Sequence, residues 1–284
     1  MTENKDQQDQ QKKKMTVEEE AERNEKLLEY DGSDKVVLAS TIWKALRKVR
    51  AKKAPIRSSF SDLNKKIGGG FFPGQLITIS GHSGEGKTTL ARTFTKAFIS
   101  QSVAPLWFSY EETPLQFLEK FPSDTYDFFY MPQELTDNKP NWIEQRIIES
   151  KLKYGTRVVF VDHLHFLIDL FRVQNSSLEI GVIVRTLKKL SITQEVVFFL
   201  IAHIGKIGKD RELQAGDIRD SSFVEQESDT VMYTWRDKED HNIVKVTKNR
   251  EGGVKDFKLT LTYHPATKLL YVTTNEKEEG GRLL

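Results

Sequence analysis

The segment GHSGEGKT at 81–88 constrains the fold of this chain more than any other feature of the sequence. It matches the pattern G-x-x-x-x-G-K-[ST] in full, and it lies between an apolar run at 76–80 and a predicted helix at 88–101. Glycines let backbone N–H groups close around phosphates, and the N-terminus of the following helix adds partial positive charge. We therefore predict a strand, a loop and a helix that bind the phosphates of ATP. The residues predicted to line them are Gly81, Ser83, Gly84, Glu85, Gly86, Lys87, Thr88 and Thr89.

Three residues in and near this loop have individual predicted roles. Lys87 should reach the β- and γ-phosphates, and the hydroxyl of Thr88 should ligate Mg²⁺. The apolar segment RVVFVD at 157–162 is typical of a buried strand and ends on Asp162. Because ligands bind at the carboxyl edge of a parallel sheet, we expect Asp162 to hold the magnesium shell, directly or through water.

Two further predicted strands end on residues that could serve the same chemistry. The strand at 105–110 is followed by Glu111 and Glu112, and a carboxylate at a strand tip can activate water in line with the γ-phosphate. We take Glu111 as the first candidate for this base and Glu112 as the second. The strand at 196–203 ends on His203, which could hydrogen-bond the γ-phosphate, although a strand-end histidine alone is more often structural.

The order of elements from residue 56 onward predicts an α/β fold. The predicted strands alternate with helices at 141–153 and 177–193, which indicates a mostly parallel sheet with helices on its faces. After residue 220 short strands follow one another and suggest an antiparallel C-terminal extension of the sheet. These short strands are predicted at 229–235, 242–248, 257–263 and 268–274.

The ends of the chain differ in composition from this domain. Residues 1–34 are rich in Gln, Glu and Lys and predict a disordered charged tail, with some helical character at 16–30. Residues 35–55 predict a linker helix with one apolar face and a basic back, which either packs on its own domain or docks on a neighbouring subunit. Residues 56–276 predict the ATPase domain, and 277–284 a flexible C-terminus.

The composition excludes several classes of protein. The chain has no cysteine, so disulfides, thiolate catalysis and cysteine-based zinc sites are excluded. No apolar run approaches the roughly 20 residues that cross a bilayer, and the polar N-terminus is no signal peptide. We expect a soluble, cytoplasmic protein without membrane partners; for a phage or organellar protein this means the host cytoplasm or the organelle matrix. The net charge of +2 means that any nucleic-acid affinity must come from local basic clusters.

The motifs together resemble the hexameric replicative helicases of the DnaB type, including phage and mitochondrial relatives, over about 56–275. The resemblance rests on their order and spacing, since a phosphate loop alone is shared by many families. The similar segments are the lead-in IRSSFSDLNKKIGGGFFPGQLITISG, the phosphate loop, FSYEE, VVFVDHLHFL with its Asp-His pair, FLIAHIGK, GDIRDSSFVEQESDTVMYTWR and VTKNREGG.

The resemblance implies a RecA-like core and a role for each matching residue. It implies that Glu111 is the general base, that Asp162 serves Mg²⁺ and that His203 senses the γ-phosphate. It also implies that Arg250 is an arginine finger for the adjacent subunit, with Lys248 as its companion. Without the resemblance, NREGG would be a solvated hairpin turn.

The resemblance further implies a ring of six subunits that moves on single-stranded DNA in replication, with other replication proteins as possible partners. In this family, loops equivalent to 205–217 face a central channel and contact the phosphates of the strand, and the segment 171–177 is a second candidate loop. The basic residues expected to make these contacts are Arg172, Lys206, Lys209 and Arg211.

The sequence also leaves other functions open. Before residue 56 it shows no pattern of a DnaB-type N-terminal helical domain, primase or zinc module, so a RecA/RadA-like or KaiC-like ATPase that does not unwind DNA is the alternative. A module that only holds nucleotide is disfavoured by the intact set of Lys87, Glu111 and Asp162. A small-molecule kinase would need a lid and an acceptor pocket, and we find the pattern of neither.

Overall fold

The protein is described by a computed structural model covering residues 16–50, 54–167, 176–205, 212–214, 216–218, 222–251 and 253–273. The chain divides into two units, Met1–Lys53 and Ala54–Leu284. Among the described helices, none is long and apolar enough to cross a membrane.

The first unit contains two helices, α1 (Val17–Leu28) and α2 (Ala39–Arg50). Helix α1 lies within the segment predicted as a disordered tail and begins with a capping box, in which the Thr16 hydroxyl and the Glu19 carboxylate each accept a backbone N–H of the other residue. None of its residues is buried. On α2, the apolar side chains of Ile42, Trp43 and Leu46 are exposed. Local hydrogen bonds rather than a core therefore define these helices.

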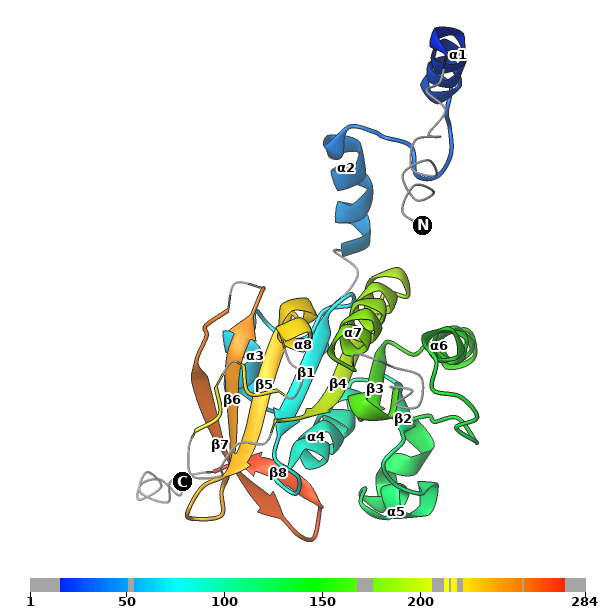
Figure 1. The fold of residues 1–284 in the computed structure, drawn as a ribbon. Coiled ribbons are helices and arrows are strands. Elements are labelled where there is room, and N and C mark those ends of the chain that lie inside the picture. The colour runs from blue at the N-terminus through cyan, green and yellow to red at the C-terminus, as the bar shows by residue number, and fades with distance from the viewer. Residues whose placement is uncertain are drawn as a thin grey trace, which may run out of the picture. The chain divides into compact units, whose positions relative to one another are not determined.

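The second unit is built on an eight-stranded sheet with the order β2-β3-β4-β1-β5-β6-β7-β8 (Figure 1). The first five strands in this order are parallel, and the last three pairings are antiparallel. The predicted α/β class with an antiparallel extension is thus confirmed, but β5 pairs parallel to β1, so the extension begins one strand later than expected. The strands are β1 Leu76–Gly81, β2 Pro105–Ser109, β3 Val158–Asp162, β4 Val197–His203, β5 Thr230–Arg236, β6 Asn242–Asn249, β7 Phe257–His264 and β8 Leu269–Val272.

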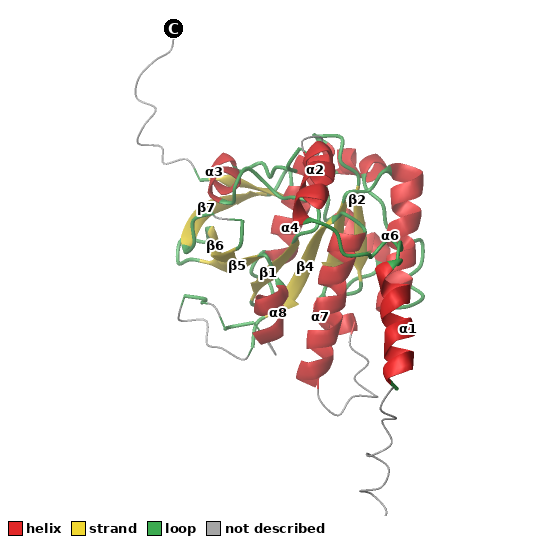
Figure 2. Ribbon diagram, turned by 90° about the horizontal axis from the view of Figure 1, so that it is seen from above, coloured by secondary structure: helices red, strands yellow, loops and turns green. Residues whose placement is uncertain are grey.

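Helices cover both faces of the sheet (Figure 2). Strands buried on two sides consist of continuous apolar runs, and their alternate side chains enter two separate cores. On β3, for example, Phe160 packs into the core under α3, α4 and α5, whereas Val159 and Val161 pack into the core under α6, α7 and α8. The helices are α3 Ser61–Lys66, α4 Lys87–Ile99, α5 Pro114–Glu119, α6 Pro140–Tyr154, α7 Ser176–Thr193 and α8 Ser222–Glu227, with 3₁₀ turns η1 Ser123–Phe128 and η2 Leu164–Leu167.

The register of the parallel strands brings their carboxyl ends to one edge of the sheet. Gly81 at the end of β1 pairs with His203 at the end of β4, and Asp162 at the end of β3 pairs with Ser109 at the end of β2. This edge, which we call the carboxyl edge, therefore collects the four strand ends that carry the sequence motifs. The opposite edge, where β1 and β5 begin, is called the amino edge.

Candidate nucleotide-binding site

The phosphate loop connects β1 to α4 at the carboxyl edge. Gly86 precedes the first turn of α4 with a φ of 84°, and a Cβ on it would lie 2.7 Å from Oδ1 of Asn242. A side chain there would be strained in both backbone and packing, so glycine is required. Ser83 and Gly84 at the tip of the loop are exposed, while the Glu85 carboxylate accepts the backbone N–H of Arg236 at 2.7 Å. The end of β5 thus supports the loop.

Lys87 lies buried at the base of the loop. Its Nζ donates to the carbonyl oxygens of Gly81 at 3.1 Å and His82 at 2.8 Å. Burial lowers the pKa of Lys87, and the nearby carboxylates of Asp162, Glu111 and Glu85 partly oppose this shift. A buried ammonium that donates to neutral carbonyl oxygens is suited to an anionic ligand such as phosphate.

Thr88 and Asp162 meet across the gap between α4 and β3. The Thr88 hydroxyl donates to Oδ2 of Asp162 at 2.8 Å, and Asp162 is only 2% exposed. Burial raises the pKa of Asp162 to about 6, and the Thr88 hydrogen bond lowers it in part. The other carboxylate oxygen, Oδ1, is buried without a hydrogen-bond partner. An all-oxygen pair with an unsatisfied carboxylate oxygen fits Mg²⁺, which prefers oxygen ligands.

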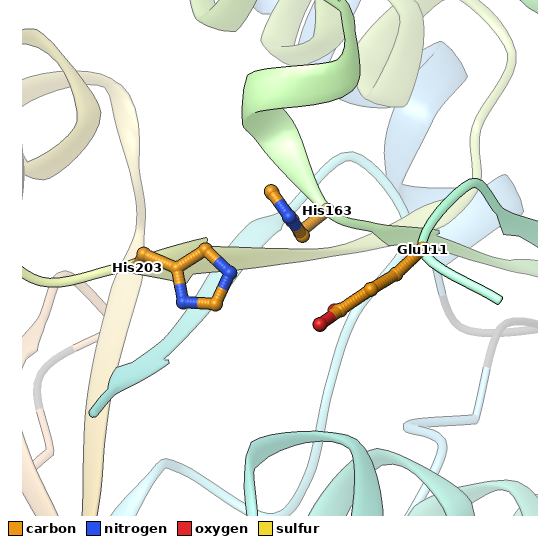
Figure 3. A group of neighbouring side chains, drawn as sticks. All are labelled: Glu111, His163 and His203. Atoms are coloured by element: carbon orange, nitrogen blue, oxygen red, sulfur yellow. The ribbon is translucent and has the colours of Figure 1, made fainter. Parts of the chain in front are cut away.

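Glu111, His163 and His203 converge on one another (Figure 3), and His163 directly follows Asp162 in the chain. One ligand atom from each side chain lies within 4.8 Å of the others, and the two imidazole ring centres are 4.2 Å apart. Glu111 is exposed, His203 is half-buried and His163 is buried. Burial lowers the pKa of His163 to about 3, with smaller contributions from His203 and His165, so its ring is neutral near pH 7.

The neighbouring carboxylate, Glu112, has different surroundings. It forms an ion pair with Lys120 on the surface, and its Oε2 is buried without a hydrogen-bond partner. Of the two adjacent glutamates, Glu111 is therefore the one that lies with the histidines.

Two residues near the site were given no role by the sequence. The sequence shows His163 only as part of an Asp-His pair, and its approach to Glu111 depends on the strand order. Arg92 is only 6% exposed, and its Nη2 donates to the Thr89 hydroxyl at 2.9 Å, while its Nε and Nη1 are buried without partners. The spacing of Arg92 from Thr88 and Thr89, four and three residues along one helix, could have placed it on the same face of α4.

Lys248 and Arg250 lie at the amino edge. Lys248 Nζ donates to backbone carbonyl oxygens of Glu225 and Gln226 in α8. Arg250 donates to the Gln226 carbonyl as well, and its Nη1 lies 3.5 Å from Oδ1 of Asp229. Both cations thus cap the end of α8 in the single subunit. The predicted DNA contacts Arg172, Lys206, Lys209 and Arg211 lie outside the described residues.

Comparison with known families supports the resemblance drawn from the motifs. Residues 130–268 match the family model of the DnaB-like helicase C terminal domain. The replicative DNA helicase DnaB of Leifsonia xyli is 24% identical over 242 residues, which cover 72% of this chain and 53% of that protein. The DNA repair protein RadA of Halalkalibacterium halodurans is 25% identical over 219 residues, which cover 74% of this chain and 44% of RadA. The chain therefore spans about half the length of these relatives.

Two solved structures show the same fold. One, described as an ATPase domain, superposes with a TM-score of 0.70 at 15% identity, covering 86% of this chain and 100% of that domain. A DnaB-like replicative helicase, solved in a study of its interactions with primase, gives a TM-score of 0.68 at 17% identity, covering 88% of this chain and 70% of the helicase. Together with the family match, these likenesses confirm the predicted DnaB-type resemblance and RecA-like core.

Proposed function

We propose that this chain, whose residues 130–268 match the DnaB-like helicase C terminal domain, is an ATP-driven DNA helicase or translocase core. The observation that carries the proposal is that two sets of charged residues lie at opposite edges of the sheet. The residues suited to bind and hydrolyse ATP converge at the carboxyl edge, whereas the candidate finger residues lie at the amino edge.

The residues at the carboxyl edge would divide the chemistry of hydrolysis among them. The loop N–H groups and Lys87 would hold the triphosphate, while Thr88 and Asp162 would hold Mg²⁺, which supplies charge neutralisation of the phosphates when bound. Glu111 would accept the proton of the attacking water, because a carboxylate at the site is a suitable general base. His203 would hydrogen-bond the γ-phosphate and lose this bond after cleavage.

The finger would act on the site of another subunit. Strand β6 runs from Asn242, which faces the phosphate loop, to Asn249, and its seven steps of about 3.3 Å separate the two ends by roughly 20 Å. Arg250 follows Asn249 and is therefore too far from the nucleotide site of its own chain. Its charge could stabilise the transition state only at the site of a neighbouring copy, which is the arrangement of a ring with head-to-tail interfaces.

The proposed ring is hexameric, works in DNA replication and moves on single-stranded DNA through contacts made by Arg172, Lys206, Lys209 and Arg211. Sequence-independent contact with phosphates suits a motor, because every nucleotide presents the same backbone. Primase or other replication proteins are further proposed partners, and the proposed compartment is the cytoplasm.

A RadA-like or KaiC-like ATPase that does not unwind DNA is the second candidate. The sequence identity to RadA, 25% over 219 residues, is close to the identity to DnaB, 24% over 242 residues. One experiment separates the two candidates: ATP hydrolysis is measured with and without single-stranded DNA, together with unwinding of a forked duplex. The helicase proposal expects stimulation by the single strand and strand separation that Lys87→Ala abolishes. Stimulated hydrolysis without unwinding would favour the RadA-like alternative, and no hydrolysis would contradict both.

A further inference from the structure

The cluster of Glu111, His163 and His203 has a donor set that ATP hydrolysis does not require. Hydrolysis needs the carboxylate as a base and one histidine as a hydrogen-bond donor, yet a second imidazole approaches both (Figure 3). The three side chains come from the ends of three adjacent strands, β2, β3 and β4, so the sheet itself holds them together. No other group of three or more such side chains with this proximity occurs in the described part of the chain.

Two imidazoles and one carboxylate are the ligands of an open zinc site. Zn²⁺ binds histidine nitrogen and carboxylate oxygen, and sites with two His and one Glu leave a position for water or an anion. Mg²⁺ is a hard cation that prefers oxygen and retains its water, so it would select the Thr88–Asp162 pair instead. The two neighbouring donor sets therefore differ in the class of metal that they bind.

The geometry requires only a small closure around an ion. Ligand atoms about 2.0–2.1 Å from a tetrahedral ion lie roughly 3.4 Å apart, whereas the three atoms here lie within 4.8 Å of one another. Glu111 is exposed and has a flexible side chain, so it can supply most of the movement toward the buried His163. The backbone N–H of His165 donates to Nδ1 of His163 at 3.3 Å. A hydrogen bond of this length is weak, so His163 can readily give it up for a bond to a metal ion.

We propose that Glu111, His163 and His203 form a binding site for a transition-metal dication, with Zn²⁺ as the preferred ion. Binding itself does not depend on the proposed helicase function. Its consequence does depend on that function, because a zinc-bound Glu111 cannot accept the proton of water and a zinc-bound His203 cannot contact the γ-phosphate. Occupancy of this site by zinc therefore switches off hydrolysis while the phosphate loop remains intact.

The test is a metal titration of the full, untagged chain without nucleotide, because triphosphates themselves chelate Zn²⁺. Zinc binding is measured by calorimetry, and Co²⁺ is used as a spectroscopic probe of the ligands. The wild type is expected to bind one Zn²⁺ per chain and to give visible Co²⁺ bands of a site with fewer than six ligands. His163→Gln should weaken zinc binding at least about 100-fold, since even indirect partners of a metal site contribute 10–100-fold.

Three further variants make the result independent of folding. Glu111→Gln changes an exposed side chain and should weaken zinc binding without altering the melting temperature. His165→Gln and His241→Gln remove histidines outside the ligand set and should bind zinc as the wild type does. The proposal would be overturned if the wild type did not bind zinc, or if Glu111→Gln and His163→Gln bound zinc as tightly as the wild type. Loss of zinc binding in either control variant would also overturn it. These outcomes are distinguishable from a failure of the helicase proposal, which would leave the metal titration unchanged.

Discussion

The two edges of the sheet carry similar kinds of charged groups but satisfy them differently. At the carboxyl edge, Asp162 has a buried oxygen without a partner, and Lys87 donates only to neutral carbonyl oxygens among the hydrogen bonds described. At the amino edge, Asp229 accepts from the backbone N–H of Leu76 at 2.7 Å and from Lys188 at 2.6 Å. The charge of Asp229 at the amino edge is therefore balanced within the chain, whereas Asp162 and Lys87 at the carboxyl edge can still interact with a ligand.

This difference distinguishes functional from structural charge. Because a buried charge without a partner is costly, an unsatisfied carboxylate indicates that a ligand completes the site. Asp229 and Asp162 are the same residue type at opposite edges, and removal of their charges should have opposite effects on stability. Arg250 differs from the other charged groups at the amino edge. Its side chain is half exposed, and we propose that it acts on a neighbouring subunit although it contacts α8 within its own chain.

The largest expected effect is that of Arg250→Ala on hydrolysis. An arginine finger accelerates phosphoryl transfer by about 10³–10⁵-fold, so we expect turnover to fall in this range while ATP affinity is preserved. Lys255→Ala is the matched control, since it removes an exposed cation from the same β6–β7 connection. Steady-state hydrolysis and equilibrium binding of a fluorescent nucleotide provide the measurements. Normal turnover in Arg250→Ala would show that the amino edge has no catalytic role.

The next effect is expected at the carboxyl edge, in Glu111→Gln. Loss of a general base reduces turnover by about 10²–10⁴-fold, and nucleotide binding should remain because the phosphates contact the loop instead. Glu112→Gln, whose carboxylate pairs with Lys120, should retain most of the activity. Single-turnover hydrolysis of both variants makes the comparison, and the reverse pattern would assign the base to Glu112.

The contrast between the two aspartates begins with Asp229→Ala. This change removes the acceptor of the Leu76 N–H and leaves Lys188 with only the Gly74 carbonyl oxygen, and we expect it to lower the free energy of unfolding by about 2–4 kcal/mol. Asp62→Ala removes an exposed partner of Lys65 and should change the free energy of unfolding by less than about 0.5 kcal/mol. Urea unfolding of both variants tests the expectation, and equal effects would show that the amino-edge pair is not structural.

The smallest and opposite effect is expected for Asp162. Its folded pKa of about 6 lies above the ordinary 3.8, so the folded chain binds its proton more tightly than the unfolded chain. This group therefore makes the metal-free protein less stable as the pH rises from about 4 to about 6, by an amount on the order of 1–3 kcal/mol. Asp162→Asn should remove this dependence when unfolding is measured without Mg²⁺ and nucleotide at pH values of about 4 and about 7. If Asp162→Asn showed the same pH dependence of stability as the wild type, Asp162 would not be its source.

Much of the fold was predictable because buried parallel strands are continuous apolar runs. The first predicted strand, at 76–80, corresponds to β1, and every predicted strand boundary lies within two residues of the observed one. The short helices α3, α5 and α8 were missed, because six residues are too few to show helical periodicity. The prediction that β5 belongs to the antiparallel extension was wrong for its pairing with β1, because the sequence does not reveal which strands β5 pairs with.

The candidate site could be predicted in its motifs but not in its arrangement. A phosphate loop and strand-end carboxylates are local patterns, so Lys87, Thr88 and Asp162 could be named as candidate site residues from the sequence. The approach of His163 to Glu111 results from strand order. The distance of Arg250 from its own nucleotide site depends on the antiparallel course of β6. Long-range arrangement of this kind is set by the fold rather than by local sequence.

The central claim is that the nucleotide site of one chain is completed by the amino edge of another. It is tested most directly by mixing Lys87→Ala, which lacks a working loop, with Arg250→Ala, which lacks the finger, and measuring hydrolysis. If subunits exchange freely, each interface has an even chance of an intact loop and of an intact finger, so about a quarter of the interfaces in mixed rings would be complete. The account predicts that equimolar mixing restores up to this share of wild-type activity, with sedimentation confirming mixed rings. Activity that stays at the sum of the two separate variants, in rings shown to be mixed, would contradict it.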